Sequence, residues 1–118
     1  MWIIKSFNEL TTIELYTYLQ LRVNVFIVEQ SCPYPELDGY DLDSYHLTYI
    51  ENDEVLAYAR ILPAGIKYQR TSIGRVIVDQ KSRGRGLAKE LMNQAINKKK
   101  KKWPNTDIQL QAQTHLKH

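Results

Sequence analysis

SIGRVIV (72–78), DQKS (79–82) and RGRGLA (83–88) are consecutive pieces of the chain, and together they decide its fold. The first piece is short, apolar and rich in β-branched residues, which is typical of a buried strand. The third piece begins a pattern in which apolar residues recur every three or four positions, as on one face of a helix. These residues are Leu87, Ala88, Leu91, Met92, Ala95 and Ile96. The sequence therefore predicts a strand, a basic turn that contains glycine, and a helix.

The turn between this strand and this helix has the chemistry of an anion site. The first N–H groups of a helix lack partners inside the helix, and the helix dipole favours negative charge there. Gly84 and Gly86 would let a phosphate approach the main chain, while Arg83 and Arg85 add charge and fork-shaped donors. A Walker loop is excluded because the turn lacks GxxxxGK[ST]. A dinucleotide fingerprint is excluded because Lys89 stands where the last glycine belongs.

The run Lys81-Ser82-Arg83-Gly84-Arg85-Gly86 resembles the [Q/R]-x-x-G-x-[G/A] loop of the GNAT superfamily of N-acetyltransferases, which holds the pyrophosphate of coenzyme A. Its first position departs from that pattern, since it is a lysine. RGRG alone is also common in disordered nucleic-acid-binding tails. Its place between a β-branched strand and an apolar helical pattern makes the resemblance more specific. The remaining alternative is an ordinary strand, turn and helix with a basic surface.

A second set of residues is similar to one branch of that superfamily, the ElaA-like acetyltransferases. The set extends over most of the chain, from Leu21 to Ala112. It consists of Leu21-Arg22, Val25-Phe26, Val28-Glu29-Gln30, Cys32-Pro33-Tyr34, Glu36, Asp38-Gly39, Asp41, His46, Tyr58-Ala59-Arg60 and Ile73-Gly74-Arg75-Val76.

The resemblance implies an α/β (α+β) fold with a mixed, mostly antiparallel twisted sheet, helices on both faces, and a central pair of parallel strands that splay apart. Acetyl-coenzyme A would enter the gap as cosubstrate, and an amine would attack its thioester directly in a ternary complex. A backbone N–H near Val76 would stabilise the oxyanion. The implied cofactor-binding residues are Val76, Ile77 and Val78 on the pantetheine arm, and Arg83, Gly84, Arg85, Gly86, Leu87 and Ala88 on the pyrophosphate.

The resemblance also suggests residues for the acceptor side. Glu29 and His46 are the candidates for general base, directly or through water, although His46 fits a plain strand position equally well. Arg22, Arg60 and Arg75 would shape the acceptor pocket, because arginine stays charged and does not exchange protons near neutral pH. The acceptor would be an amine on a small molecule or a peptide, and no metal is expected.

The remaining pattern predicts one domain over residues 1–118. Its expected elements are strands at 2–6, 45–51, 55–62, 72–78 and 107–112, with helices at 12–29 and 86–102. The first helix should begin at a capping box formed by Thr11 and Glu14. Its apolar stripe, Leu15, Leu19, Arg22 and Phe26, contains a charged group. A charge on a buried stripe needs an internal ion pair, a snorkelling side chain or a place that lines a cleft, and the sequence leaves these open.

Charge is unevenly distributed along the chain. Residues 1–59 carry two basic and ten acidic side chains, a net charge of −8, whereas residues 60–118 carry 14 basic and three acidic ones, a net charge of +11. This division suits a basic acceptor and an anionic cofactor, although two differently solvated faces would give the same counts. In the loop at 31–44, Asp38, Asp41 and Asp43 would form either an acidic rim or a solvated loop. Their spacing misses the calcium-loop pattern.

Composition limits the remaining classes. No apolar run approaches the ~20 residues of a membrane span. There is no secretory signal, and one cysteine, Cys32, cannot form an internal disulfide, so we expect a cytoplasmic protein with no membrane partner. A homo-oligomer is left open. The chain stops at His118, where the resemblance implies a further helix and strands. It therefore predicts a C-terminally incomplete fold with weak or no turnover.

The main alternative function is a basic nucleic-acid-binding module that uses Arg83, Arg85 and Lys98 to Lys102. The acidic first half of the chain argues against it, as does the lack of aromatic residues among the lysines.

Overall fold

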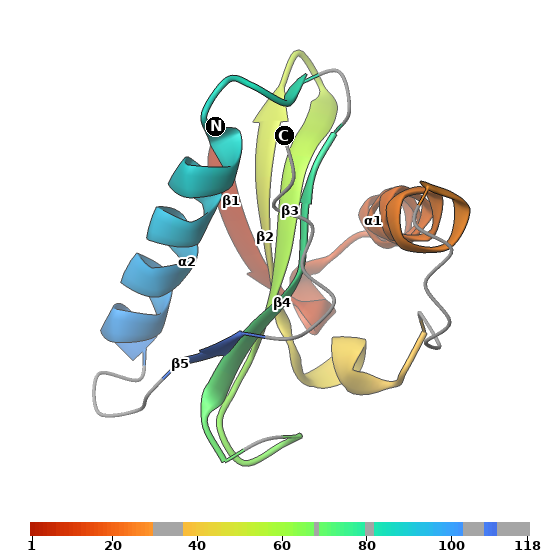
Figure 1. Cartoon of the computed structure of the whole chain (residues 1–118). Coiled ribbons are helices and arrows are strands. Elements are labelled where there is room, and N and C mark those ends of the chain that lie inside the picture. Colours follow the sequence, from red (N-terminus) through yellow and green to blue (C-terminus); the bar gives the residue numbers. More distant parts are fainter. Residues whose placement is uncertain (30–36, 68, 80–81, 103–107, 111–118) are drawn as a thin grey trace.

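A five-stranded sheet with a helix on each face forms the body of the molecule (Figure 1). The computed structural model describes residues 1–29, 37–67, 69–79, 82–102 and 108–110. The strands lie in chain order: β1 (Trp2–Ser6), β2 (Tyr45–Glu51), β3 (Glu54–Leu62), β4 (Thr71–Val78) and β5 (Ile108–Leu110). The first four are antiparallel and β5 is parallel to β4. The mixed, mostly antiparallel fold is therefore confirmed.

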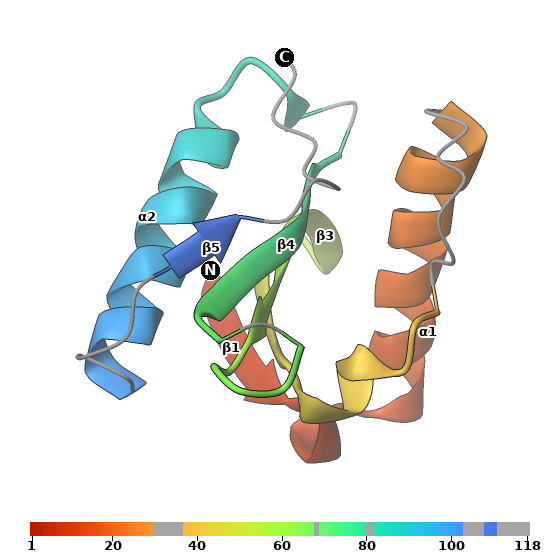
Figure 2. The same ribbon diagram turned by 60° about the horizontal axis from the view of Figure 1, so that its bottom comes forward.

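Two long helices cover the sheet, α1 (Thr12–Arg22) on one face and α2 (Leu87–Lys102) on the other (Figures 1 and 2). The helix that starts with α1 continues to Glu29 in a wider, π-type winding, η2 (Val23–Glu29). Two short 3₁₀ helices complete the described elements, η1 (Phe7–Glu9) and η3 (Tyr40–Asp43). The predicted element bounds agree with these to within one or two residues where both ends are described.

The start of α1 follows from its capping box. The Thr11 hydroxyl accepts from the Glu14 N–H at 3.0 Å, and the Glu14 carboxylate accepts from the Thr11 N–H at 2.8 Å. The buried side of the helix differs from the predicted stripe: it centres on Tyr18 and Arg22, while Leu15 and Leu19 are only half-buried. Tyr18 takes the central place because its ring packs on that of Tyr58, with centroids 5.4 Å apart.

Strand β4 is buried along its whole length because it lies between two apolar clusters. The larger cluster packs the sheet against α2 and includes Leu47, Ile61, Leu91 and Ala95. The smaller one packs it against the α1 side and consists of Tyr18, Val25, Phe26, Tyr58 and Ile77.

A β-bulge interrupts β4 at its middle. Gly74 is opposite Arg60 and Ile77 is opposite Tyr58, so two residues of β4 face the single residue Ala59. The two residues are Arg75 and Val76. Arg75 has φ 51°, in the left-handed region that a residue with a side chain seldom adopts.

The bulge changes which side chains face which helix. Ile73, Val76 and Val78 all belong to the cluster under α2, although strict alternation would put Ile73 and Val76 on opposite faces. Ile77 belongs to the cluster on the α1 side. The one extra residue thus shifts the alternation of the strand halfway along it.

The described part of β5 pairs in parallel with the first part of β4. Thr71, Ser72 and Ile73 are opposite Ile108, Gln109 and Leu110. Within the described residues, β4 beyond Ile73 has a strand neighbour on the β3 side alone.

Candidate functional site

The glycine turn joins the end of β4 to the first turn of α2. The Gly86 carbonyl accepts from the Glu90 N–H at 3.2 Å, so Gly86 caps the helix and the N–H groups of Leu87, Ala88 and Lys89 have no intrahelical acceptor. Gly84 has φ 90° and Gly86 has φ 78°. A Cβ added at either glycine would meet no atom within 4 Å. The turn therefore offers open space beside helix-start donors that have no acceptor inside the helix, which is the arrangement that a phosphate needs.

The side chains of the turn have different surroundings. Leu87 is 9% exposed and packs in the cluster under α2, so only its main chain can face a ligand. The Arg83 Nε donates to the Val78 carbonyl at 3.0 Å. Both terminal guanidinium nitrogens of Arg85 donate to the Glu51 carboxylate, at 3.3 and 3.1 Å. Because this pair is exposed to solvent, it is weak, and a phosphate could displace it.

The main chain from Val76 to Val78 runs from the bulge to the glycine turn. Ile77 and Val78 pair with Tyr58 and Ala57 of β3 on one side. On the other side, the described pairing with β5 extends from Thr71 to Ile73. The nine sequence-predicted cofactor residues thus lie on two described segments, the end of β4 (76–78) and the turn with the first residues of α2 (83–88).

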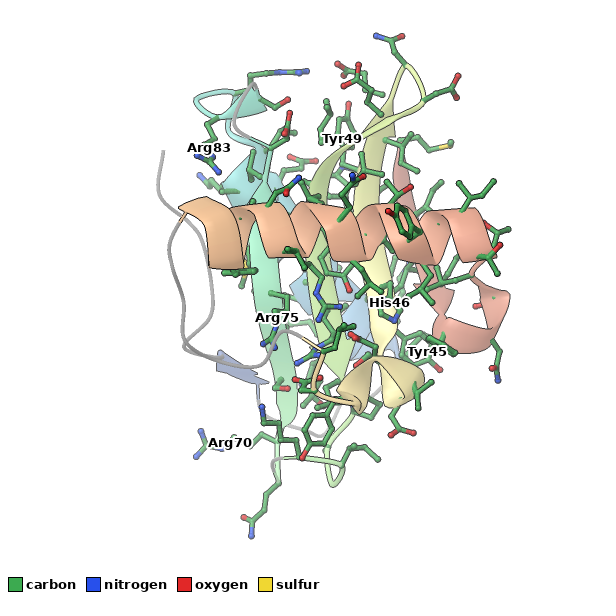
Figure 3. The ribbon with its side chains drawn as sticks, turned by 90° about the vertical axis from the view of Figure 1, so that its right-hand side faces the viewer. Tyr45, His46, Tyr49, Arg70, Arg75 and Arg83 are labelled. Atoms are coloured by element: carbon green, nitrogen blue, oxygen red, sulfur yellow. The ribbon has the colours of Figure 1, made fainter. Side chains whose placement is uncertain are left out.

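The three arginines predicted for the acceptor pocket meet beneath α1, as Figure 3 shows for Arg75. Arg22, Arg60 and Arg75 come from three elements and are each at most 1% exposed. Arg60 binds the Asp38 carboxylate through both terminal nitrogens, at 2.8 and 2.9 Å. Arg75 also reaches Asp38, at 3.3 Å.

Asp41 is the second carboxylate of this network. It accepts from Arg22 at 2.6 Å and from Arg60 at 3.2 Å. Burial of Asp38 opposes ionisation, but the hydrogen bond and charge of Arg60 outweigh it and lower the pKa of Asp38 to about 2. The expectation of an acidic rim or a solvated loop is therefore wrong for Asp38 and Asp41, which are internal partners of arginine; Asp43 is exposed.

His46 lies on the same face of the sheet with both ring nitrogens engaged (Figure 3). Its Nε2 is 3.1 Å from the Asp41 carbonyl, which can only accept, so this nitrogen carries the proton. The Nδ1 then accepts from the Tyr58 hydroxyl at 2.6 Å. Burial lowers the pKa of His46 and raises the pKa of Tyr58, so both are neutral near pH 7. The side chain of the other base candidate, Glu29, lies outside the described residues, as does Cys32.

The lysine run is only partly a solvated helix end. Lys99 is 6% exposed on the core face of α2, one turn after Ala95. Lys102 places its Nζ 4.5 Å from the centroid of the Tyr45 ring, within reach of a cation–π interaction. Lys99, Lys102 and Arg85 thus each contact other parts of the protein. The nucleic-acid alternative would need these basic side chains to bind its ligand together.

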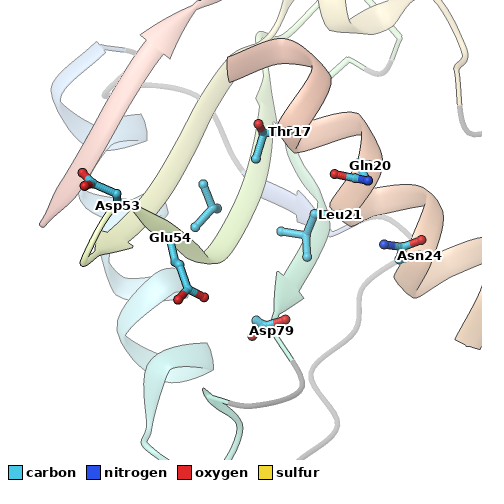
Figure 4. Close-up of a pocket in the computed structure, with 8 residues that line it drawn as sticks. Thr17, Gln20, Leu21, Asn24, Asp53, Glu54 and Asp79 are labelled. Atoms are coloured by element: carbon cyan, nitrogen blue, oxygen red, sulfur yellow. The ribbon is translucent and has the colours of Figure 1, made fainter. Parts of the chain in front are cut away.

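A groove of about 310 Å³ separates α1 from the hairpin turn of β2 and β3 (Figure 4). It is lined by Thr17, Gln20, Leu21, Asn24, Asp53, Glu54, Val55 and Asp79. Sequence reasoning did not identify this groove, although its four helix residues recur at helical spacing. In the part of the chain that the structure describes, no three His, Cys, Asp or Glu side chains are placed to hold a metal ion. No helix among those residues is long and apolar enough to cross a bilayer.

Residues 11–115 match the model of the Acetyltransferase (GNAT) family. The chain belongs to the GNAT family. Among GNAT proteins it is similar to Protein ElaA of Escherichia coli strain K12, at 42% identity over 113 residues, which are 94% of this chain and 74% of that protein.

Solved structures give the same result. The crystal structure of Escherichia coli ElaA has a TM-score of 0.89 at 42% identity and covers 98% of this chain and 80% of that chain. An acyl-CoA N-acyltransferase from Pseudomonas aeruginosa has a TM-score of 0.87 at 41% identity, over 93% of this chain and 77% of that one. A predicted acetyltransferase with acetyl-CoA from Clostridium acetobutylicum shares the fold, with a TM-score of 0.68 at 18% identity over 96% and 80% of the two chains. The ElaA-like resemblance and the acyltransferase class are confirmed.

Proposed function

We propose that this GNAT protein transfers an acetyl group from acetyl-CoA to a primary amine, by direct attack of the amine in a ternary complex. The glycine turn carries the proposal. It combines two left-handed glycines, open space and N–H groups without an intrahelical acceptor at the start of α2, after a buried strand. The acetyl-CoA in the Clostridium acetobutylicum structure of the same fold supports this choice of anion.

The residues of the turn and of β4 would divide the work. The N–H groups from Arg83 to Ala88 would hold the pyrophosphate, and the main chain of Val76 to Val78 would pair with the pantetheine arm. Acetyl-CoA supplies an activated thioester carbonyl with a thiolate leaving group. The chain would contribute orientation and a donor near Val76 for the charge that develops on the carbonyl oxygen.

The amine must lose a proton before it attacks, and Glu29 and His46 remain our candidates for that step. His46 is neutral near pH 7, as a base must be. Both of its ring nitrogens are hydrogen-bonded, so it would accept a proton only if its bond with Tyr58 opened. Glu29 follows from the resemblance alone. We therefore expect Glu29→Gln to lower turnover more than His46→Gln does.

Charge on the α1 side supports a cationic acceptor. The groove in Figure 4 carries the carboxylates of Asp53, Glu54 and Asp79, which would attract an ammonium group toward this side. Arg22, Arg60 and Arg75 are bound to aspartates, so they would shape the acceptor pocket by fixing its wall.

The first test is calorimetric titration with acetyl-CoA of the wild type and two matched variants. Gly84→Val places a branched side chain in the proposed phosphate cradle. Gly65→Val is the control, because Gly65 is also exposed, has φ 87° and has open space around it, but lies in a turn away from α2. We expect saturable binding by the wild type and by Gly65→Val, and at least tenfold weaker binding by Gly84→Val.

Two results would count against the proposal. One is equal binding by both valine variants. The other is no binding by a wild-type chain that circular dichroism shows to be folded. If the chain instead bound single-stranded DNA with an affinity that collapses with salt, the nucleic-acid alternative would replace the proposal.

A further inference from the structure

A small pocket adjoins the glycine turn on the side of β1 and β2. It has a volume of about 150 Å³ and is lined by Trp2, Tyr49, Arg85, Gly86, Leu87 and Glu90. Three of these residues, at positions 85–87, also belong to the proposed phosphate cradle. A ligand whose phosphates occupy the cradle therefore has this pocket beside it.

Two aromatic rings form one wall of the pocket. Trp2 of β1 and Tyr49 of β2 are directly opposite in the antiparallel register, so both side chains lie on the α2 face of the sheet. Their ring centroids are 4.8 Å apart, and the ring planes are inclined by 48°. Both rings are only partly buried and border the pocket, so part of their surface can contact a ligand. Such a wall suits a flat heterocycle, because a heterocycle stacks on aromatic side chains.

The polar groups of the pocket suit a nucleotide. The Tyr49 hydroxyl donates to the Glu51 carboxylate at 3.1 Å, and the same carboxylate accepts from Arg85. Arg85 lines the pocket and belongs to the cradle, so its positive charge is available beside the rings for a phosphate. Glu90 adds a carboxylate to the lining, which can accept from an exocyclic amino group such as that of adenine.

We propose that this pocket binds the adenine ring of acetyl-CoA and that the ring packs on Trp2 and Tyr49. This inference rests on the proposed function and adds a selectivity to it. An acetyl group on a bare phosphopantetheine arm has the same thioester but no adenine. The pocket would therefore favour free coenzyme A thioesters over acyl groups on a protein-bound phosphopantetheine arm.

The first test follows Trp2 by its fluorescence. The chain has two tryptophans, Trp2 and Trp103, so Trp103→Phe leaves Trp2 as the only one. Acetyl-CoA should quench the emission of Trp2 in this variant, with the same midpoint that calorimetry gives for binding. S-acetyl-4′-phosphopantetheine, which lacks the adenosine, should leave the emission unchanged at concentrations where calorimetry shows it bound.

The second test compares the dissociation constants of these two probes by calorimetry. Trp2→Leu and Tyr49→Leu each keep an apolar side chain and remove a ring. Each should reduce the preference for acetyl-CoA about tenfold, the size expected for the loss of one contact between a base and an aromatic ring. The affinity for S-acetyl-4′-phosphopantetheine should stay within about twofold, because the glycine turn is unchanged.

Tyr49→Phe is the matched control. It keeps the ring and loses only the hydroxyl that donates to Glu51. It should therefore keep the wild-type ratio of the two dissociation constants.

Unchanged Trp2 emission at saturating acetyl-CoA would overturn the inference. A wild-type ratio in both leucine variants would do the same, as would an equal loss in Tyr49→Phe. If a leucine variant failed to fold, as judged by circular dichroism, the fluorescence of Trp2 in the Trp103→Phe variant would decide. If the wild type bound both probes equally tightly, this inference alone would fail. If it bound neither, the proposed function would fail and the inference with it.

Discussion

Arg75 has a backbone conformation that favours glycine, yet it carries one of the largest side chains in the core. Two substitutions of Arg75 separate the effect of its ion pair from the effect of its strained backbone. Arg75→Ala loses the ion pair and keeps the strain, whereas Arg75→Gly loses the pair and relieves the strain. We expect the glycine variant to be more stable than the alanine variant by about 1 kcal/mol in urea unfolding.

The matched control for this comparison is Asn93, an exposed residue in the middle of α2. There the order should reverse, with Asn93→Gly less stable than Asn93→Ala by about 1 kcal/mol, since glycine weakens a helix interior. Equal stability of the two variants at position 75 would contradict the strained conformation.

Single-residue roles could be predicted only in part. The resemblance grouped Arg22, Arg60 and Arg75, and the structure brings them together. Their pairing with Asp38 and Asp41 was missed, because a sequence does not show which loop folds back onto a buried face. The bulge could not be predicted for a different reason. In a strand that is buried on both faces, polar and apolar residues do not alternate, so the sequence does not show where the facing of the side chains changes.

Among the elements, α1 depends on the capping box at its start. Thr11→Ala removes the acceptor of the Glu14 N–H and should lower the free energy of unfolding by about 1 kcal/mol. Thr12→Ala is the control, because Thr12 is equally exposed and is not the cap. Its effect, measured in the same urea titration, should stay within about 0.5 kcal/mol. Similar losses at both positions would show that the cap is not what holds the helix end.

In the glycine turn, Glu51 and a phosphate would compete for Arg85. Glu51→Gln removes the negative charge beside Arg85 and one of the two oxygens that accept from it, so we expect acetyl-CoA to bind about two- to fivefold more tightly in calorimetry. Glu54→Gln, the same charge change three residues away at the hairpin, should have a smaller effect. If Glu51→Gln weakened binding, the pair would instead be orienting Arg85 for the ligand.

Elements were more predictable than residues because their signals are local. Thr11 and Glu14 marked a helix start, and Gly84 and Gly86 marked a turn before another helix. The π-type winding after Arg22 was not predicted. It depends on what the helix packs against, and a segment of seven residues is too short to show a distinct sequence period.

At the scale of the whole molecule, stability should fall in acid because of Asp38. Its pKa is about 2 in the folded chain against an ordinary value of 3.8. A lowered folded pKa means that its contribution is complete above about pH 4 and is lost as the pH falls toward 2. The difference corresponds to about 2 kcal/mol. The free energy of unfolding in urea, measured between pH 5 and 2.5, should therefore fall more steeply for the wild type than for Asp38→Asn.

A second pH window comes from His46. Burial lowers its folded pKa, so the unfolded chain binds its proton more readily than the folded chain. Stability from this residue is complete above about pH 6.5 and declines as the pH falls below it. The free energy of unfolding, measured from pH 8 to 5, should decline less in His46→Gln than in the wild type. Parallel curves would mean that His46 has the same proton affinity in both states.

The bulge in β4 also has a consequence for chain length. Since Arg75 is one residue more than the ladder needs, its removal would leave Gly74 opposite Arg60, Val76 opposite Ala59 and Ile77 opposite Tyr58. The strand would then be regular, and the two apolar clusters would keep their members. Deletions inside a buried strand normally reverse every side chain beyond them, but this one would not. In an aligned sequence without the bulge, the difference would appear as a one-residue gap in the middle of the core.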